Sequence, residues 1–134
     1  MATLKLEIVT PEAKVYSEDV DMVTLPAVEG EMGILPMHVP LMTQLTSGEI
    51  IARKGGQDFF LAVGDGFVEV TGERVSIITD MAIQAENIDE AKAEEARRRA
   101  EARLAERLDD TEVASVNAAL AHSLAQLKVK RRQR

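Results

Sequence analysis

The chain has 134 residues, of which 46% are hydrophobic and 29% charged, and its formal net charge is −7. This length suffices for one domain with a modest core, or for a smaller domain with an appended element. The chain has no cysteine, which excludes disulfides and thiolate-bound metals as the source of its stability. No apolar run approaches the roughly 20 residues of a membrane span, and the first ten residues do not resemble a signal peptide. We expect a soluble chain that is not exported.

The composition divides the chain near residue 87. Residues 1–87 carry a net charge of −9 and hold all eight glycines, whereas residues 88–134 carry +2 and contain 11 alanines and no glycine. Glycine marks turns and alanine favours helix. We therefore expect one domain over 1–87 and a second, helical unit over 88–134. The acidic first region argues against nucleic acid as a partner, because phosphate contacts need clustered lysine and arginine.

Short apolar runs between glycine-rich turns predict strands in the first region. Residues 3–10 alternate apolar and polar side chains, which is the period of two of a half-buried strand, before Pro11 ends the run. Many such strands, joined by glycine-containing hairpin turns, predict an antiparallel β-sandwich or barrel. The other predicted strands cover 20–25, 48–53, 58–63, 67–70 and 74–79.

From Asn87 onward the pattern is that of helices. Asn87 and Glu90 have the spacing of an N-terminal capping box, and Asp109 and Glu112 repeat that spacing after a run without helix breakers. A short polar link between two helices predicts an antiparallel helical hairpin. Its first helix offers mostly alanine to the partner, so we expect the hairpin to be weakly held by its own packing. The predicted apolar stripes are Ala93, Ala96, Ala100, Leu104 and Leu108 on one helix, and Val113, Val116, Leu120, Leu124 and Leu127 on the other.

The stretch 30–41 contains His38, one of only two histidines and the obvious candidate for a general base. No nucleophile motif accompanies it, and His122 stands alone on the alanine-rich second helix. Two histidines this far apart, without cysteine, do not have the ligand spacing of a metal site. We therefore predict no catalytic residue and no metal site. We interpret His38 as a structural or interface residue and His122 as a surface residue or a contact within the hairpin.

Arginines dominate the first predicted helix. Arg99, Arg103 and Arg107 follow one another at intervals of four, a spacing at which like charges repel. A partner with carboxylates or phosphates would relieve the repulsion. The alternative is a solvated helix face, on which the glutamates four residues before Arg98 and Arg99 form ordinary ion pairs.

A longer pattern, G-x-x-G-x-L-x-x-H-x-P-L, is met at Gly30, Gly33, Leu35, His38, Pro40 and Leu41. Together with GDGFVEV at 64–70 and the alanine-rich hairpin, it closely resembles the epsilon-subunit family of bacterial and chloroplast rotary ATP synthases, over the whole chain. The resemblance implies a non-catalytic central-stalk subunit that couples proton or sodium transport to ATP synthesis. It also implies that the hairpin inhibits ATP hydrolysis. The expected location is the cytoplasmic face of the bacterial inner membrane, or alternatively the stromal face of the thylakoid membrane.

The same resemblance assigns partners to particular residues. The acidic turn would face the ring of membrane c subunits, the stretch after it would lie against the gamma subunit, and two arginines would reach the alpha/beta catalytic head when the hairpin extends. The c-ring residues are Glu29, Glu31, Met32 and Gly33; the gamma residues are His38, Pro40, Leu41, Met42 and Thr43; the head residues are Arg103 and Arg107.

A nucleotide site is also implied. Some bacterial members of the family bind ATP through an I/L-D-x-x-R-A motif, which this chain meets at Ile88 and Asp89 but changes at Lys92, with Arg99 downstream. Lysine replaces the planar fork of arginine by a point charge. We therefore predict weak ATP binding or none, and no other cofactor. The alternative is a plain helix start, where Asp89 favours the positive end of the helix dipole.

One alternative function remains open from the residues alone. The chain could be a small β-sandwich that binds a ligand, with the helical hairpin serving only for dimerisation.

Overall fold

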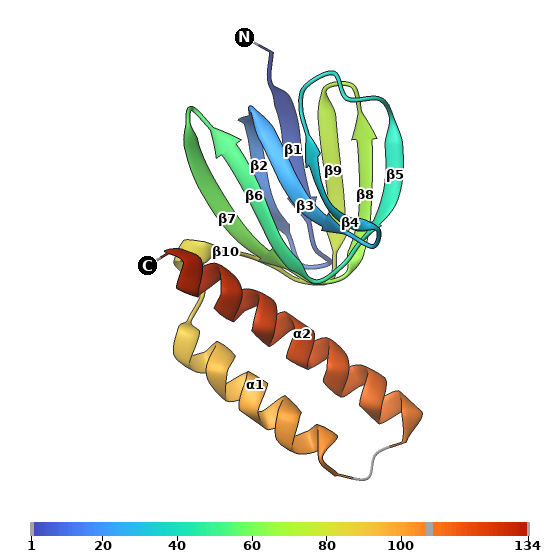
Figure 1. Cartoon of the computed structure of the whole chain (residues 1–134), viewed down its shortest axis with the longest axis vertical. Helices are drawn as coiled ribbons and strands as arrows, with labels where there is room; N and C mark the ends of the chain where they lie inside the picture. The colour runs from blue at the N-terminus through green and yellow to red at the C-terminus, as the bar shows by residue number, and fades with distance from the viewer. Residues whose placement is uncertain (1, 107–108, 134) are drawn as a thin grey trace.

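A computed structural model describes residues 2–106 and 109–133 of the chain. It confirms the predicted fold, an N-terminal β-sandwich followed by a C-terminal antiparallel helical hairpin (Figure 1). The strands are β1 (Leu4–Val9), β2 (Lys14–Val20), β3 (Met22–Ala27), β4 (Gly30–Ile34), β5 (Leu41–Leu45), β6 (Gly48–Lys54), β7 (Gln57–Val63), β8 (Gly66–Thr71), β9 (Arg74–Thr79) and β10 (Ala82–Gln84). After a single 3₁₀ turn, Ala85–Asn87, come α1 (Glu90–Leu104) and α2 (Asp110–Gln133).

The strands follow the order β10-β7-β6-β3-β5-β8-β9-β1-β2, with β4 paired to β3. The pairs are antiparallel except β1 with β9, which run parallel with Leu6 opposite Val75. The two ends of this path approach each other, since the Gln84 side-chain amide in β10 donates a hydrogen bond of 3.3 Å to the carbonyl of Val15 in β2. The sheet therefore curls around a single interior.

The interior follows from the alternation seen in the sequence. In β1 every second side chain is buried, and Leu4, Leu6 and Ile8 are at most 2% exposed. Burying one such side chain stabilises the fold by roughly 1.5–3 kcal/mol. The same alternation continues in β3, β8 and β9, so that one core lies between the two halves of the curled sheet.

The sequence pattern did not predict four of the strands, which are β2, β4, β5 and β10. The first is rich in charged residues, the second contains two glycines, the third has the adjacent polar residues Thr43 and Gln44, and the fourth has three residues. Each of them is formed because a neighbouring strand offers backbone hydrogen-bonding groups, which propensity alone does not reveal.

The first helix begins two residues later than predicted. Asn87 lies in the 3₁₀ turn, and the cap is Asp89, whose Oδ1 accepts a hydrogen bond of 3.1 Å from the backbone N–H of Lys92. The cap predicted for the second helix is confirmed, because Asp109 Oδ1 accepts from the N–H of Glu112 at 2.8 Å.

The apolar stripes are only partly right. Ala93 and Ala100 of α1 are buried, but Leu124 of α2 is 46% exposed, while Ala125 and Val129 are buried instead. The reason is that α2 has two partners: Figure 1 shows it between the sandwich and α1. The apolar stripe predicted for α2 assumed that α1 is its only partner, so it missed the residues of α2 that face the sheet. Leu108 lies outside the described residues.

Within the described residues, neither helix combines the length and the apolar character needed to cross a membrane.

Candidate functional site

The residues predicted for the c-ring contact occupy one end of the sandwich, but only one of them lies in a turn. The turn consists of Val28 and Glu29, whereas Glu31, Met32 and Gly33 belong to β4. The prediction of one acidic turn that contains all four residues was therefore wrong, because Gly30 to Ile34 pair with β3 in full register. Gly30 does have a positive φ of 124°, which glycine adopts readily at the start of this strand. Both acidic side chains, Glu29 and Glu31, are exposed.

The residues predicted for the gamma contact begin at the opposite end. The loop from β4 to β5 contains His38 and Pro40, and the N–H of Met37 in this loop donates to Gly72 O in the β8–β9 turn at 2.8 Å. His38 Nδ1 donates to the carbonyl of Val39 at 2.7 Å. This contact with a neighbouring backbone group gives His38 a local structural role.

Beyond the loop, an apolar patch covers the outer face of three adjacent strands. Met42 of β5, Phe67 of β8 and Ile78 of β9 are 69%, 57% and 64% exposed. Phe67 and Ile78 are paired directly across the strands, and all three side chains line one shallow pocket of about 150 Å³. We call these three residues the β5–β8–β9 patch. Of these three residues, only Met42 was predicted from the sequence as a contact residue. Phe67 and Ile78 could have been identified because they alternate with core residues along β8 and β9.

Of the predicted nucleotide residues, Ile88 and Asp89 directly precede α1, and Lys92 and Arg99 lie within it. Asp89 is committed to the helix cap, Ile88 is buried at 4% exposure, and Lys92 is exposed. Arg99 follows Lys92 by seven residues, about two helical turns, and therefore lies on nearly the same helix face about 10 Å further along. Its guanidinium forms an ion pair of 2.8 Å with Glu95. A bound phosphate would have to compete with that carboxylate.

Two arginines of the series Arg99, Arg103 and Arg107 form ion pairs within the hairpin. Arg99 pairs with Glu95 at 2.8 Å, as the ion-pair alternative predicted. Arg103 pairs with Glu112 across the link between the helices at 3.2 Å, a contact that the sequence did not predict. Arg107 lies outside the described residues.

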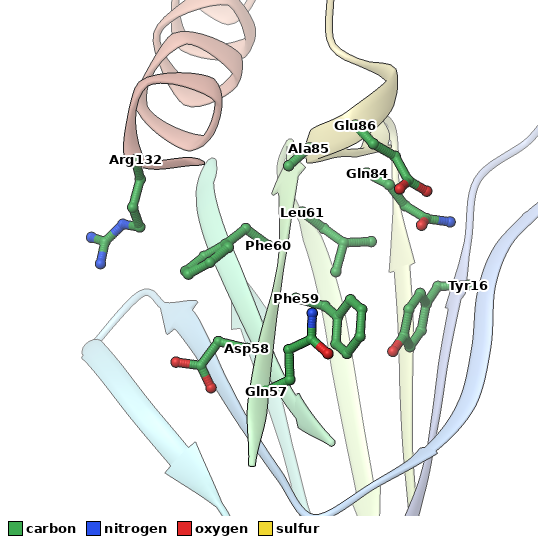
Figure 2. Close-up of a pocket in the computed structure, with 10 residues that line it drawn as sticks. All are labelled: Tyr16, Gln57, Asp58, Phe59, Phe60, Leu61, Gln84, Ala85, Glu86 and Arg132. Carbon is green, nitrogen blue, oxygen red and sulfur yellow. The ribbon is translucent and has the colours of Figure 1, made fainter. Parts of the chain in front are cut away.

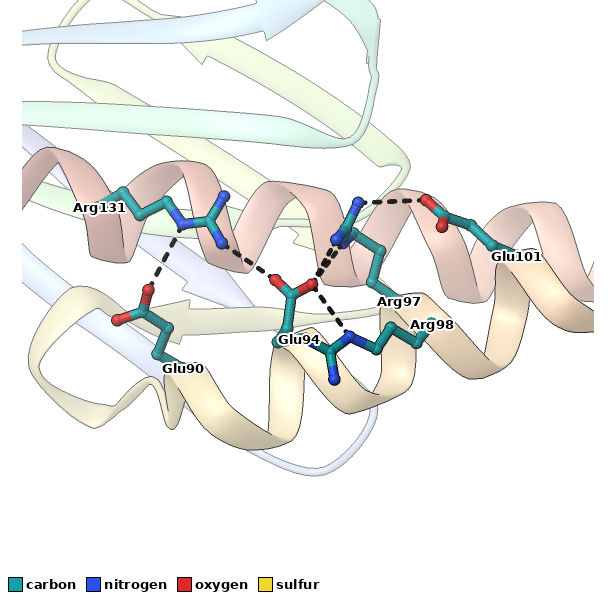
Figure 3. A network of polar contacts seen from close by, with 6 residues as sticks. All are labelled: Glu90, Glu94, Arg97, Arg98, Glu101 and Arg131. Carbon is teal, nitrogen blue, oxygen red and sulfur yellow. Dashed lines mark hydrogen bonds and ion pairs between the residues drawn. The ribbon is translucent and has the colours of Figure 1, made fainter.

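A polar network joins α1 to α2 (Figure 3). Glu94 is its centre and accepts hydrogen bonds from Arg97 on its own helix and from Arg131 of α2, the latter at 3.0 Å. Arg98 adds an ion pair with Glu94 at 3.6 Å. Arg131 also reaches Glu90, at 3.4 Å. The hydrogen bond from Arg97 and the surrounding guanidinium charges lower the pKa of Glu94. Through Arg131, the network connects the start of α1 to the end of α2.

A second, smaller apolar cluster attaches α2 to the sandwich. Ala125 and Val129 of α2 pack on Ala62 of β7, with Ile88 and Ala85 completing the buried set. The end of α2 adds Arg132, whose guanidinium carbon lies 5.7 Å from the centre of the Phe60 ring. Figure 2 shows both side chains at the edge of a pocket of about 320 Å³ between β2, β7, β10 and α2.

Glu49 of β6 lies beneath the same end of α2 and was not found from the sequence. Its side chain is 4% exposed, and its Oε2 is 3.0 Å from Arg132 Nε without the alignment of a hydrogen bond. Burial raises the pKa of Glu49, and the charges of Arg132 and Lys128 oppose that rise. An isolated glutamate in a predicted strand gives no sequence signal of burial, because the residue that covers it comes some eighty positions later.

The interpretation of His122 as a mere surface or hairpin residue also changes. Its Nε2 lies 3.3 Å from Asp80 Oδ2, so the side chain connects α2 to the end of β9. Gly64 permits this contact, since a Cβ there would lie 1.9 Å from Asp80 Oδ1 and 2.7 Å from His122 Nε2. No group of three or more acidic or histidine side chains in the described part of the chain could hold a metal ion.

The chain matches known proteins over nearly its whole length. Residues 3–85 match the family model "ATP synthase, Delta/Epsilon chain, beta-sandwich domain", and residues 86–131 match "ATP synthase, Delta/Epsilon chain, long alpha-helix domain". An ATP synthase epsilon chain of Dehalococcoides mccartyi is 47% identical over 100% of this chain and 96% of its own length. That of Bacillus subtilis is 44% identical over 84% of this chain and 86% of its own.

Solved structures agree with these relatives. A chain in the Euglena gracilis mitochondrial ATP synthase OSCP/F1/c-ring structure superposes with a TM-score of 0.79 at 27% identity, covering 96% of this chain and 81% of that one. A chain of the Tetrahymena thermophila central stalk and c ring shares the fold, with a TM-score of 0.55 at 11% identity over 97% and 95% of the two chains. A β-sandwich and a helical hairpin, matched by both parts of the family at full length, identify the chain as a member of the ATP synthase delta/epsilon family and an epsilon subunit of ATP synthase.

Proposed function

We propose that the chain is a non-catalytic subunit of the central stalk, which couples proton or sodium transport to ATP synthesis by joining the gamma subunit to the c ring. The observation that carries the proposal is the exposed β5–β8–β9 patch on a chain of this family. Large apolar side chains that gather on one face typically mark a protein contact. The patch is assigned to gamma, together with the adjoining residues His38, Pro40, Leu41, Met42 and Thr43.

The acidic end of the sandwich is assigned to the c ring. Glu29 and Glu31 are exposed there and can pair with basic loops, while Met32 and Gly33 shape the strand beside them. This contact would hold the subunit at the cytoplasmic face of the membrane.

The hairpin is assigned the inhibition of ATP hydrolysis. Among the described residues, its attachment to the sandwich includes a small apolar cluster, the Arg132–Glu49 ion pair and the His122–Asp80 contact. None of these belongs to the sandwich core, so the hairpin can leave while that core stays intact. Once released, the hairpin would extend toward the alpha/beta head and offer Arg103 and Arg107 to it. The functional division of the chain is therefore proposed at 1–87 and 88–134. ATP, if bound at Ile88, Asp89, Lys92 and Arg99, is held weakly.

Co-purification with gamma tests the first assignment. Replacing Phe67 by Glu places a charge in the patch and should abolish a 1:1 complex with gamma, since the charge would have to be desolvated in the contact. Phe59→Glu is the matched control, because Phe59 is 40% exposed on β7, outside the patch. Equal recovery of gamma with both variants would refute the assigned surface.

Truncation tests the role of the hairpin. A chain ending at Asn87 retains every strand and should still assemble with gamma. Hydrolysis by the assembled complex should then rise, and equal rates with and without the hairpin would show that its role is not inhibition.

A further inference from the structure

Glu49 is buried by the hairpin rather than by the sandwich core. In the β6–β7 pair Glu49 stands directly opposite Ala62, and opposed residues of an antiparallel pair point to the same face of the sheet. Ala62 packs against Ala125 and Val129 of α2. The face that carries Glu49 is therefore the docking face, and departure of α2 would return the carboxylate to water.

The charges around this carboxylate compensate it incompletely. Arg132 and Lys128 of α2 face it with positive charge, and Glu31 of β4 faces it with negative charge. Arg132 is itself 48% exposed, so water screens part of its attraction. Glu49 Oε2 is fully buried and, among the described residues, no donor forms a well-aligned hydrogen bond to it. A buried carboxylate in this condition is better accommodated when it carries a proton.

We propose that docking of α2 on the β6–β7 face is coupled to the binding of a proton by Glu49, so that acid favours the docked hairpin and alkali favours its release.

The direction of the pH effect follows from the linkage between proton binding and docking. The docked state has the higher pKa at Glu49, because burial outweighs the opposing charges, whereas in the released state the carboxylate returns toward its ordinary value of 4.5. The docked state thus binds more protons, and lowering the pH shifts the equilibrium toward it. The effect begins as the pH falls through the raised value of the docked state and is complete below 4.5. Each pH unit between the two values corresponds to about a tenfold change in the docking constant.

His122 of α2 also contacts the sandwich, with its Nε2 3.3 Å from Asp80 Oδ2. The contribution of Glu49 is therefore measured in a chain that carries His122→Asn, which removes the imidazole from this contact.

The first experiment is a carbon-detected NMR titration of the Glu49 carboxyl in the full His122→Asn chain. Its midpoint should lie above 4.5, and it should fall when Ala125→Gln and Val129→Asn displace α2 from the sheet. Both added side chains are neutral, so they introduce no charge near Glu49. A midpoint at or below 4.5 in the docked chain would overturn the proposal.

The second experiment follows docking itself. The chain has no cysteine, so Glu12→Cys on the sandwich and Ala114→Cys on α2 give a unique pair of spin labels at exposed sites. In the His122→Asn background, Val129→Ala is added to weaken docking, because this side chain is fully buried in the cluster between α2 and the sheet. The docked fraction should increase as the pH is lowered, whereas Glu49→Gln, which keeps the shape of the side chain but cannot ionise, should remove that dependence. An unchanged pH dependence with Glu49→Gln would refute the coupling.

Discussion

The change in hairpin docking that Val129→Ala causes can be calculated from the structure and tested. The Val129 side chain is fully buried between α2 and the sheet, beside Ala125 and Ala62. Val129→Ala removes two methyl groups, each contributing about 0.8 kcal/mol when buried, and the residual cavity raises the total cost to about 2 kcal/mol. The better helix propensity of alanine favours docked and released helices alike. The docking constant should therefore fall about thirtyfold, while the sandwich core, which does not contain Val129, keeps its stability.

Native-state hydrogen exchange measures this change for each element. Amides of α2 should exchange about thirtyfold faster in the variant if they exchange through the released state, and those of β1 and β9 should be unaffected. Leu124→Ala is the matched control, since Leu124 is 46% exposed on the same helix and its removal should change little. Equal acceleration in both variants, or loss of protection in the core strands, would refute the reasoning that Val129 holds a separable element.

Three further predictions concern other positions. Gly66→Ala should destabilise the whole sandwich, because the new Cβ would lie 1.9 Å from the backbone oxygen of Ile78, whereas Gly64→Ala should displace only the Asp80 and His122 side chains; thermal unfolding distinguishes the two. Lys92→Arg should strengthen ATP binding roughly ten- to a hundredfold in isothermal titration, by restoring a bidentate donor. Glu31→Lys should leave the fold intact but weaken ATP-driven proton pumping by the assembled enzyme.

Each of these has a result that contradicts it. Equal melting temperatures for the two glycine variants would mean that β8 and β9 separate more easily than their register indicates. Tight, micromolar binding of ATP by the unmodified chain would contradict the weakening assigned to lysine. Unchanged pumping in Glu31→Lys would remove that residue from the proposed c-ring contact.

The architecture was predictable because it depends on local patterns. The alternation of Leu4, Leu6 and Ile8 defines a half-buried strand, and Asp109 with Glu112 defines a helix start, in both cases through residues close together in the chain. β4 was mistaken for a turn because its glycines suggest turns, while its pairing with β3 is decided by residues on the other strand.

The site was less predictable because its contacts join distant segments. Glu49 and Arg132 are 83 positions apart, and His122 and Asp80 are 42 apart. Nothing near Glu49 in the sequence indicates that a helix will cover it. The arginines of α1 illustrate the converse: their spacing indicates repulsion, but Glu112 beyond the helix link supplies a counter-charge to Arg103.

The parallel pairing of β1 with β9 sets an order in which the molecule can form. Leu6 cannot meet Val75 until nearly seventy further residues have been synthesised, so the first strand to leave the ribosome must wait for one of the last strands of the sheet. Closing so long a segment is slow in folding because its entropy is lost before the contact forms. The helices are made later still, and they arrive at a surface that is already complete. A nascent chain halted before β9 would expose the unpaired edge of β1, and it is this stage that is expected to need protection from aggregation.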